Sequence, residues 1–247
     1  MKVPGVAINP GSVPLFNRLN EKLFFRSAVR LRNGSPPGRD SGQEFIMSSP
    51  RVPQAAVDGQ FVNRWSGRAF ASDSIPQPVI DSLFEAARWA PSCFNEQPWL
   101  FVYAAAEADL ARMRSLPVAK NRSWADRAPL LVLVLARTSF EKNGKPNRHA
   151  AFDAGAAWMS LALQAHAHGL MTHAMAGFDE AAAYSLCGVS PQRYTALAMI
   201  AVGKSGDAAN LPPDLAAIEH PNGRKDAGRV AVPLSGIAAL LAAGGMP

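Results

Sequence analysis

Residues 150–168 form a long segment that limits the folds open to this chain of 247 residues. Ala, Leu, Met and Trp dominate it, and Gly169 follows as a typical helix end. A helix that is apolar on nearly all sides has to be buried in a core or in an interface. Two uninterrupted apolar runs, residues 130–136 and 195–202, have the length of strands covered on both faces. Strands interleaved with helices predict a layered α/β or α+β domain.

Weaker patterns predict shorter elements around this centre. Pro76 is expected at the first helical position of a helix whose apolar stripe runs through residues 79–90. Asp179 is expected to cap a second helix. Residues 106–113 and 234–243 are predicted to be small helices, and residues 100–105 and 170–176 to be extended.

Composition predicts an N-terminal leader that is followed by a single folded domain. Residues 1–60 are rich in Pro, Gly, Ser and Arg without a lasting period, so they are predicted to be poorly ordered, with Met47 as an alternative start. A basic tail without function and a transit peptide both remain open for this leader. The folded domain is expected over residues 61–247.

Charge and hydropathy exclude two classes of partner. Residues 1–46 hold seven Lys or Arg against three acids, which is +4 of the net charge of +6, so the domain has no basic stripe for nucleic acid. No run of about 20 apolar residues predicts a membrane span, and no signal peptide is visible. A cytoplasmic protein is expected.

Several familiar motifs are incomplete. Gly203-Lys204-Ser205 lacks the earlier glycine of a P-loop, and neither GxGxxG nor GxSxG occurs. His166 and His168 are two residues apart on a helix and face different ways, so packing or surface roles are expected for both and for His173. The sequence shows neither a base nor a helix N-terminus beside Cys93, so a buried or semi-buried thiol is expected rather than a nucleophile.

Three separated segments point to an anionic, planar ligand. Arg64-Trp65-Ser66-Gly67-Arg68 offers two guanidiniums and a hydroxyl, which suit a phosphate group. Residues 91–99, PSCFNEQPW, form a polar loop held between prolines. Arg224-Lys225 adds a basic pair.

In this order and spacing, the segments resemble the nitroreductase family of FMN-dependent oxidoreductases, over residues 63–237. The family's Arg-x-Ser-x-Arg/Lys motif is matched by Arg64, Ser66 and Arg68. Its Pro-Ser-Ser-x-Asn-x-Gln-Pro-Trp loop is matched by residues 91–99, except that Cys93 replaces the second Ser. Further similar segments are Asn121 with residues 128–129, and residues 167–170, 176–179, 201–203 and 224–225.

The resemblance implies a role for each motif. Arg64 and Ser66 are expected to hold the FMN phosphate, with Arg224 closing on it and Arg229 as a competitor for that role. Arg68 is expected at the N1–C2=O edge of the flavin, where a cation stabilises the anionic reduced form. The implied cofactor-binding set is Arg64, Trp65, Ser66, Arg68, Pro91, Ser92, Cys93, Asn95, Asn121, Met175, Ala176, Gly177, Arg224 and Lys225. In this set, Asn121 would form hydrogen bonds with the pyrimidine edge of the flavin. Residues 175–177 would offer backbone groups to one face of the ring. The residues from 91–95 would reach the FMN of the partner subunit.

The implied fold is a three-layer α/β/α arrangement of the α+β class, with a mixed sheet flanked by helices and completed by dimerisation. The implied protein is a homodimer that passes a hydride from NADH or NADPH through flavin N5 to a nitroaromatic or quinone by a ping-pong mechanism. No metal and no catalytic side chain are implied. Ala176 stands where many members carry Glu, which weakens any role for an acid there. Reductive dehalogenation, flavin fragmentation, FMN storage and a scaffold without cofactor remain as alternatives.

Overall fold

The computed structural model describes residues 51–242. The predicted leader and the alternative start at Met47 lie largely outside the described residues. The expected boundary between residues 60 and 61 falls inside the first helix, α1 (Gly59–Asn63). Among residues 51–242, no helix is long and apolar enough to cross a membrane.

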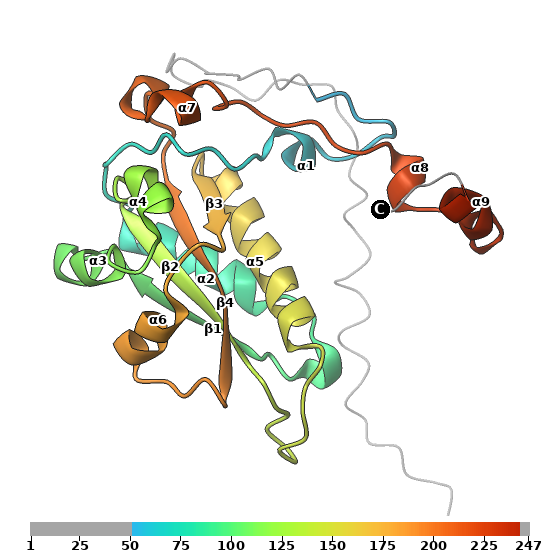
Figure 1. Cartoon of the computed structure of the whole chain (residues 1–247), viewed down its shortest axis with the longest axis horizontal. Coiled ribbons are helices and arrows are strands. Elements are labelled where there is room, and N and C mark those ends of the chain that lie inside the picture. The colour runs from blue at the N-terminus through green and yellow to red at the C-terminus, as the bar shows by residue number, and fades with distance from the viewer. Residues whose placement is uncertain (1–50, 243–247) are drawn as a thin grey trace, which may run out of the picture. The chain divides into compact units, whose positions relative to one another are not determined.

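Four strands form the central sheet in the order β1-β2-β4-β3 (Figure 1). They are β1 (Trp99–Ala104), β2 (Leu130–Arg137), β3 (Met171–Met175) and β4 (Tyr194–Gly203). All three neighbouring pairs are antiparallel, so the expected mixed sheet is wrong for the strands described here. The reason is that β2 and β3 do run parallel, but β4 lies between them and pairs antiparallel with both.

Strand β2 shows why the continuous apolar pattern was informative. Leu130, Val132 and Val134 belong to the hydrophobic cluster on one face of the sheet. Leu131 and Leu133 belong to the cluster on the other face. Because successive side chains of a strand point to opposite faces, a strand covered on both sides needs no polar positions.

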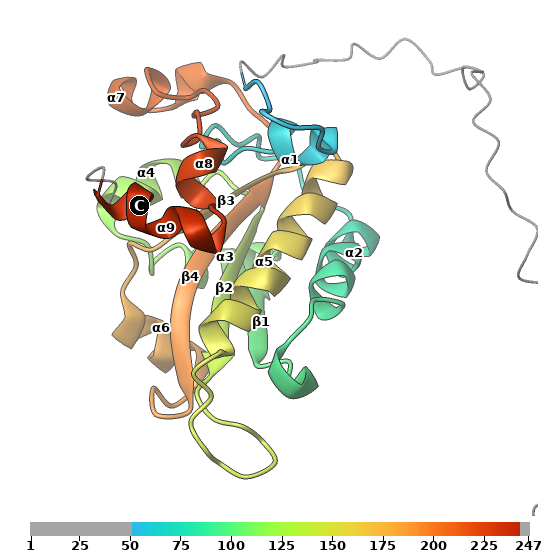
Figure 2. The same cartoon turned by 90° about the vertical axis from the view of Figure 1, so that its right-hand side faces the viewer.

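Two long helices cover the first face. They are α2 (Gln77–Arg88) and α5 (Ala150–Ala167), and they lie together on one side of the sheet in Figures 1 and 2. The buried residues Ile80 and Leu83 of α2 and Leu161 of α5 meet β2 and β4 there. Pro76 is the N-cap of α2 rather than its first helical residue.

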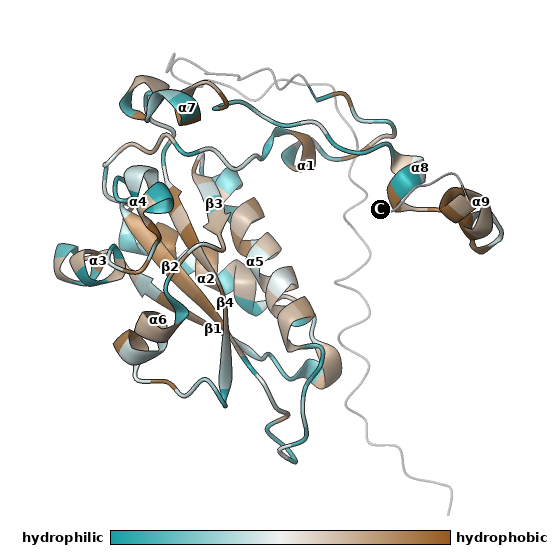
Figure 3. Cartoon of the chain, in the orientation of Figure 1, coloured by the Kyte–Doolittle hydropathy of each residue, from teal (hydrophilic) through white to brown (hydrophobic). Residues whose placement is uncertain are grey.

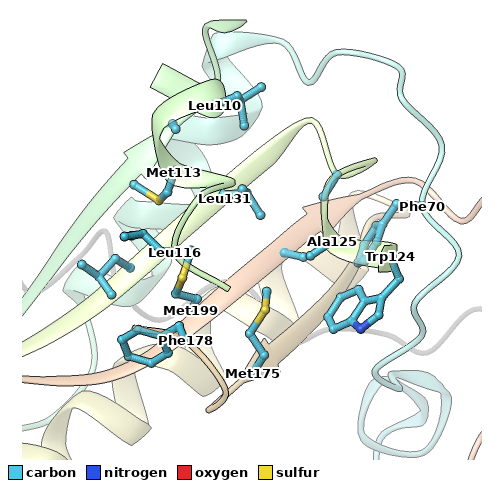
Figure 4. Packing of buried hydrophobic residues seen from close by; sticks show 14 of the residues in the cluster. Phe70, Leu110, Met113, Leu116, Trp124, Ala125, Leu131, Met175, Phe178 and Met199 are labelled. Atoms are coloured by element: carbon cyan, nitrogen blue, oxygen red, sulfur yellow. The ribbon is translucent and has the colours of Figure 1, made fainter. Parts of the chain in front are cut away.

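Shorter helices cover the second face. They are α3 (Glu107–Met113), α4 (Ala119–Ala125) and α6 (Glu180–Cys187), and the cap predicted for α6 is confirmed because Asp179 accepts from the N–H of Ala182. Figure 4 shows Met113, Met175 and Met199 within the cluster that these helices share with the sheet. The three-layer α+β architecture is therefore confirmed.

The remaining elements are small. They are the 3-10 turns η1 (Cys93–Asn95), η2 (Ala208–Asn210) and η3 (Leu234–Gly236), and the helices α7 (Pro213–Ala216), α8 (Ala227–Val230) and α9 (Ile237–Ala242). In the hydropathy colouring of Figure 3 the central strands are brown, which marks the sheet as the centre of the core.

Candidate functional site: an arginine cluster and a strained loop

A strip of backbone, residues 64–71, passes the end of β4. Phe70 forms an antiparallel bridge with Ser205, and the N–H of Gly206 donates to the carbonyl of Ala69 (2.6 Å). A Cβ on Gly206 would lie 2.7 Å from backbone atoms, so only glycine permits this approach. The segment that resembled a P-loop therefore serves as the backbone partner of the strip.

Arg51 ties the start of this strip to a distant segment. Its Nε donates to the carbonyl of Asn222 (2.7 Å), and its Nη1 donates to the carbonyls of Val62 (3.1 Å) and Arg64 (2.9 Å). Arg224 lies in the same segment and donates to the carbonyl of its neighbour Gly223 (2.9 Å). The guanidinium of Arg51 thus links the start of the strip to Asn222, which lies 171 positions after Arg51 in the sequence.

The positive charges of Arg51, Arg64 and Arg224 repel one another at the start of the strip. Burial lowers the pKa of Arg64, and the charge of Arg224 lowers it further. The pKa of Arg51 is lowered by burial and then by the charges of Arg224 and Arg64. Within residues 51–242, neither Arg64 nor Arg224 forms an ion pair with a carboxylate.

The same place has a buried donor that no described residue satisfies. The Nε of Arg64 is buried and makes no hydrogen bond within residues 51–242, while its Nη1 lies 3.5 Å from Oγ of Ser66. Buried donors are normally satisfied, so an orphaned one next to like charges indicates room for an anion. Arginine and hydroxyl groups are the usual ligands of a phosphate, so this donor set fits the phosphate of FMN.

Arg68, at the other end of the strip, is held by a buried acid. Oε1 of Glu219 accepts from the backbone N–H groups of Arg68 (2.5 Å) and Ala69 (2.8 Å). Oε2 of Glu219 lies 3.9 Å from Nη1 of Arg68. The side chain of Glu219 is 5% exposed, and that of Arg68 is 25% exposed.

His173 supports the middle of the strip from β3. Its Nδ1 lies 3.1 Å from the carbonyl of Gly67, and its ring packs 4.5 Å from that of Trp124. Burial lowers the pKa of His173 to about 4, so the ring is neutral near pH 7. Residues 51–242 contain no cluster of His, Cys, Asp or Glu that could hold a metal.

Asn121 of α4 meets the turn that follows β3. Its Nδ2 donates to the carbonyl of Gly177 (2.9 Å), which also accepts from the N–H of Val118 (3.0 Å). A Cβ on Gly177 would lie 2.9 Å from that Nδ2. The structure therefore brings Asn121 together with residues 175–177, where Met175 is buried and Ala176 exposed.

The loop of residues 91–99 has an unusual backbone. Phe94, Asn95 and Gln97 have φ values of 54°, 56° and 48°, a region that favours glycine. Phe94 is also 89% exposed. Such strain persists only where surrounding contacts enforce it, and it concentrates at functional sites.

Two acids hold this loop in place. Asp153, a buried residue of α5, accepts from the N–H of Cys93 (3.0 Å). Glu96 pairs with Arg137 at the end of β2 (2.6 Å). Within the loop, Oγ of Ser92 accepts from the N–H of Gln97 (3.0 Å).

The loop and the arginine cluster lie at opposite ends of α5. The loop contacts Asp153 in the first turn of α5. In the last turn, burial and then the charge of Arg64 lower the pKa of His166, which places Arg64 near that end. Thirteen residues of helix span roughly 20 Å. One chain therefore does not bring residues 91–95 to its own Arg64.

The comparisons with known proteins agree with this arrangement. The Nitroreductase family model matches residues 62–204, more than half of the chain and the part that holds the strip, the loop and the sheet. The chain belongs to the nitroreductase family. The family predicted from the motifs is thereby confirmed.

The relatives of this nitroreductase family member differ in sequence identity and in how much of the chain they cover. A solved structure of an oxidoreductase containing FMN is 36% identical, covers 74% of this chain and 94% of its own, and superposes with a TM-score of 0.71. An enone reductase of gut-bacterial fatty acid saturation, CLA-ER, is 22% identical with a TM-score of 0.58, covering 71% and 96%, so it shows the fold alone. An uncharacterized 15.4 kDa protein of Mycolicibacterium smegmatis is 37% identical over 36% of this chain. A Rhodopseudomonas palustris protein named for NADH dehydrogenase and NAD(P)H nitroreductase is 27% identical over 37%. The matched regions span 58% and 47% of these last two proteins, about half of their length.

The structure separates the predicted site residues into three groups. The first holds Arg64, Ser66, Arg68 and Arg224 near the strip; the second holds Asn121, Met175, Ala176 and Gly177; the third holds Pro91, Ser92, Cys93 and Asn95 at the loop. Trp65 packs against the hydrophobic cluster, and Lys225 is exposed. Arg224 rather than Arg229 is the basic residue whose charge acts on Arg64.

Sequence reasoning missed three residues at these places, Arg51, Asp153 and Glu219, and it gave a fourth, His173, a packing or surface role without placing it at the strip. Arg51 lies before the matched region, and Glu219 lies 151 residues after Arg68. Asp153 and His173 stand on α5 and β3 among apolar neighbours. A buried acid within an apolar helix was the one visible signal, because such residues are rarely buried without a partner.

Proposed function

We propose that this chain is an FMN-dependent oxidoreductase that takes a hydride from NADH or NADPH and reduces a nitroaromatic or quinone-type acceptor. The observation that carries the proposal is the cluster of Arg64 and Arg224 with the orphaned Nε of Arg64, within the family's own motif. The FMN-containing relative and the NAD(P)H-named relative support the cofactor and the donor.

In this proposal the strip binds and orients the cofactor. Arg64, Ser66 and Arg224 would hold its phosphate, and Arg68 would lie at the N1–C2=O edge. Asn121 and the backbone of residues 175–177 would contact the pyrimidine edge and one ring face. When bound, the flavin supplies the hydride chemistry at N5. The protein would supply position and a dry slot, and no side chain need act as an acid or base.

We further propose a homodimer whose two sites are shared. The separation of loop and arginine cluster along α5 supports it, because residues 91–95 lie far from their own Arg64 and are therefore expected to contact a flavin held by the other subunit. Large apolar side chains near the loop also support it: Trp89, Phe94 and Phe152 are 72%, 89% and 80% exposed. Exposed apolar side chains gathered in one region are typical of interfaces. The cytoplasmic location stays a prediction.

An anaerobic visible titration tests the proposal. The full chain is saturated with FMN, separated from free flavin, and titrated first with NADPH and then with NADH. Stoichiometric bleaching of the flavin band is expected, and the donor that bleaches it is identified in the same experiment. A bound flavin that neither donor reduces would instead favour an FMN storage protein, and a chain that binds no FMN would contradict the proposal.

A further inference from the structure

Glu219 is a buried acid that the cofactor assignment leaves without a role. It follows α7, its side chain is 5% exposed, and its Oε1 accepts two backbone N–H groups of the strip. Its Oε2 is buried and has no hydrogen-bond partner among the described residues. A buried carboxylate is costly unless it is paired, so the cation that pairs with it among residues 51–242 has to offset its charge.

That cation is Arg68. Nη1 of Arg68 lies 3.9 Å from Oε2 of Glu219, which is an ion-pair distance but too long for a hydrogen bond. His173, which contacts the carbonyl of Gly67, is neutral near pH 7. The ion pair that the described residues form at this end of the strip is therefore that of Arg68 and Glu219, and the carboxylate also fixes the backbone of the residue that carries the guanidinium.

We propose that Glu219 is a positioning residue that sets how much of the charge of Arg68 reaches the flavin. This inference rests on the proposed function, in which Arg68 lies at the N1–C2=O edge. A cation there stabilises the anionic reduced flavin, and an acid behind the cation offsets part of that effect. Glu219 therefore lowers the reduction potential of bound FMN while it holds Arg68 in place.

The size of the effect follows from Coulomb's law. A unit charge acting across on the order of 10 Å at an effective dielectric constant of about 20 changes an equilibrium by about tenfold. Removing the charge of Glu219 should thus favour binding of reduced over oxidised FMN by about tenfold. For a two-electron couple this is a rise of about 30 mV in midpoint potential.

The test is Glu219→Gln in the full chain loaded with FMN. Glutamine keeps an oxygen that can accept from Arg68 and Ala69, so the variant removes charge and little else. The midpoint potential is measured by anaerobic equilibration with reference dyes. Asp214→Asn, which removes an exposed acid on α7, is the matched control and should leave the potential unchanged.

Each outcome decides the inference. A rise for Glu219→Gln alone supports it, whereas an unchanged or lower potential with FMN bound overturns it and leaves the proposed function standing. If Glu219→Gln does not fold, Arg68→Gln replaces it: loss of the guanidinium should lower the potential, and an unchanged potential overturns the inference. A wild-type chain that binds no FMN overturns both proposals.

Discussion

Arg64→Met removes the central guanidinium of the cluster while keeping an unbranched side chain of similar length. A charge-assisted hydrogen bond contributes about 1.5–3 kcal/mol, so FMN binding should weaken by about 10- to 150-fold. Burial and then the charge of Arg224 lower the pKa of Arg64, and the charge of Arg64 in turn helps to lower the pKa of Arg51. Removing this guanidinium therefore removes repulsion between like charges in the protein without cofactor. The variant without cofactor should therefore be at least as stable as the wild type.

The assay compares two flavins on the same proteins. FMN and riboflavin are titrated into wild type and Arg64→Met, with binding followed by quenching of flavin fluorescence. The affinity for FMN should fall and that for riboflavin should not, because riboflavin lacks the phosphate. Arg112→Met, at an exposed position on α3, serves as the control and should change neither. An equal loss for both flavins, or a lower unfolding temperature of the cofactor-free variant, would refute the reasoning.

Three further changes test the supports of the site. His173 has a pKa of about 4 when folded against 6.5 as its ordinary value, so the unfolded chain binds a proton first as the pH falls through this window. The free energy of unfolding should therefore fall by on the order of 3 kcal/mol from pH 7 to pH 4. Urea denaturation at several pH values should show that His173→Gln lacks this part of the pH dependence. The same pH dependence in variant and wild type would contradict the role given to His173. Gly67→Ala places a Cβ 2.2 Å from Sδ of Met171 and should cost about 1–3 kcal/mol, so an unchanged unfolding temperature would be inconsistent with this packing. Asp153→Ala should cost about 1.5–3 kcal/mol and speed hydrogen exchange at the amide of Cys93, and continued protection of that amide would show that other contacts hold the loop.

The elements of the domain could be predicted from local patterns, but the order of the strands could not. Residues 130–136 and 195–202 were identified as buried strands because their apolar runs show burial directly. Whether β4 pairs beside β2 or beyond β3 depends on contacts between segments far apart in sequence. The mixed sheet implied by the family resemblance is wrong for the described strands, because β4 lies between β2 and β3 and pairs antiparallel with both.

The motifs predicted the groups of the site, while the residues that support them came only from the structure. Arg64 and Ser66 stand in a compact pattern whose chemistry suits phosphate. Glu219 has no pattern around it, because it acts on Arg68 through a contact across 151 residues. Arg51 could not be predicted either, because its hydrogen bonds go to backbone carbonyls. Every residue has such a carbonyl, so the sequence carries no mark of these partners.

The place of β4 in the sheet has a consequence for biosynthesis. β4 is the last of the strands that the structure describes, yet it is the partner of both β2 and β3. Until residue 203 has left the ribosome, β3 has no neighbour and β2 exposes one apolar edge. At about 5–20 residues per second, synthesis from the end of β2 to the end of β4 takes roughly 3–13 s. A nascent chain stalled between β3 and β4 would present these edges to other chains, and unpaired strand edges favour aggregation.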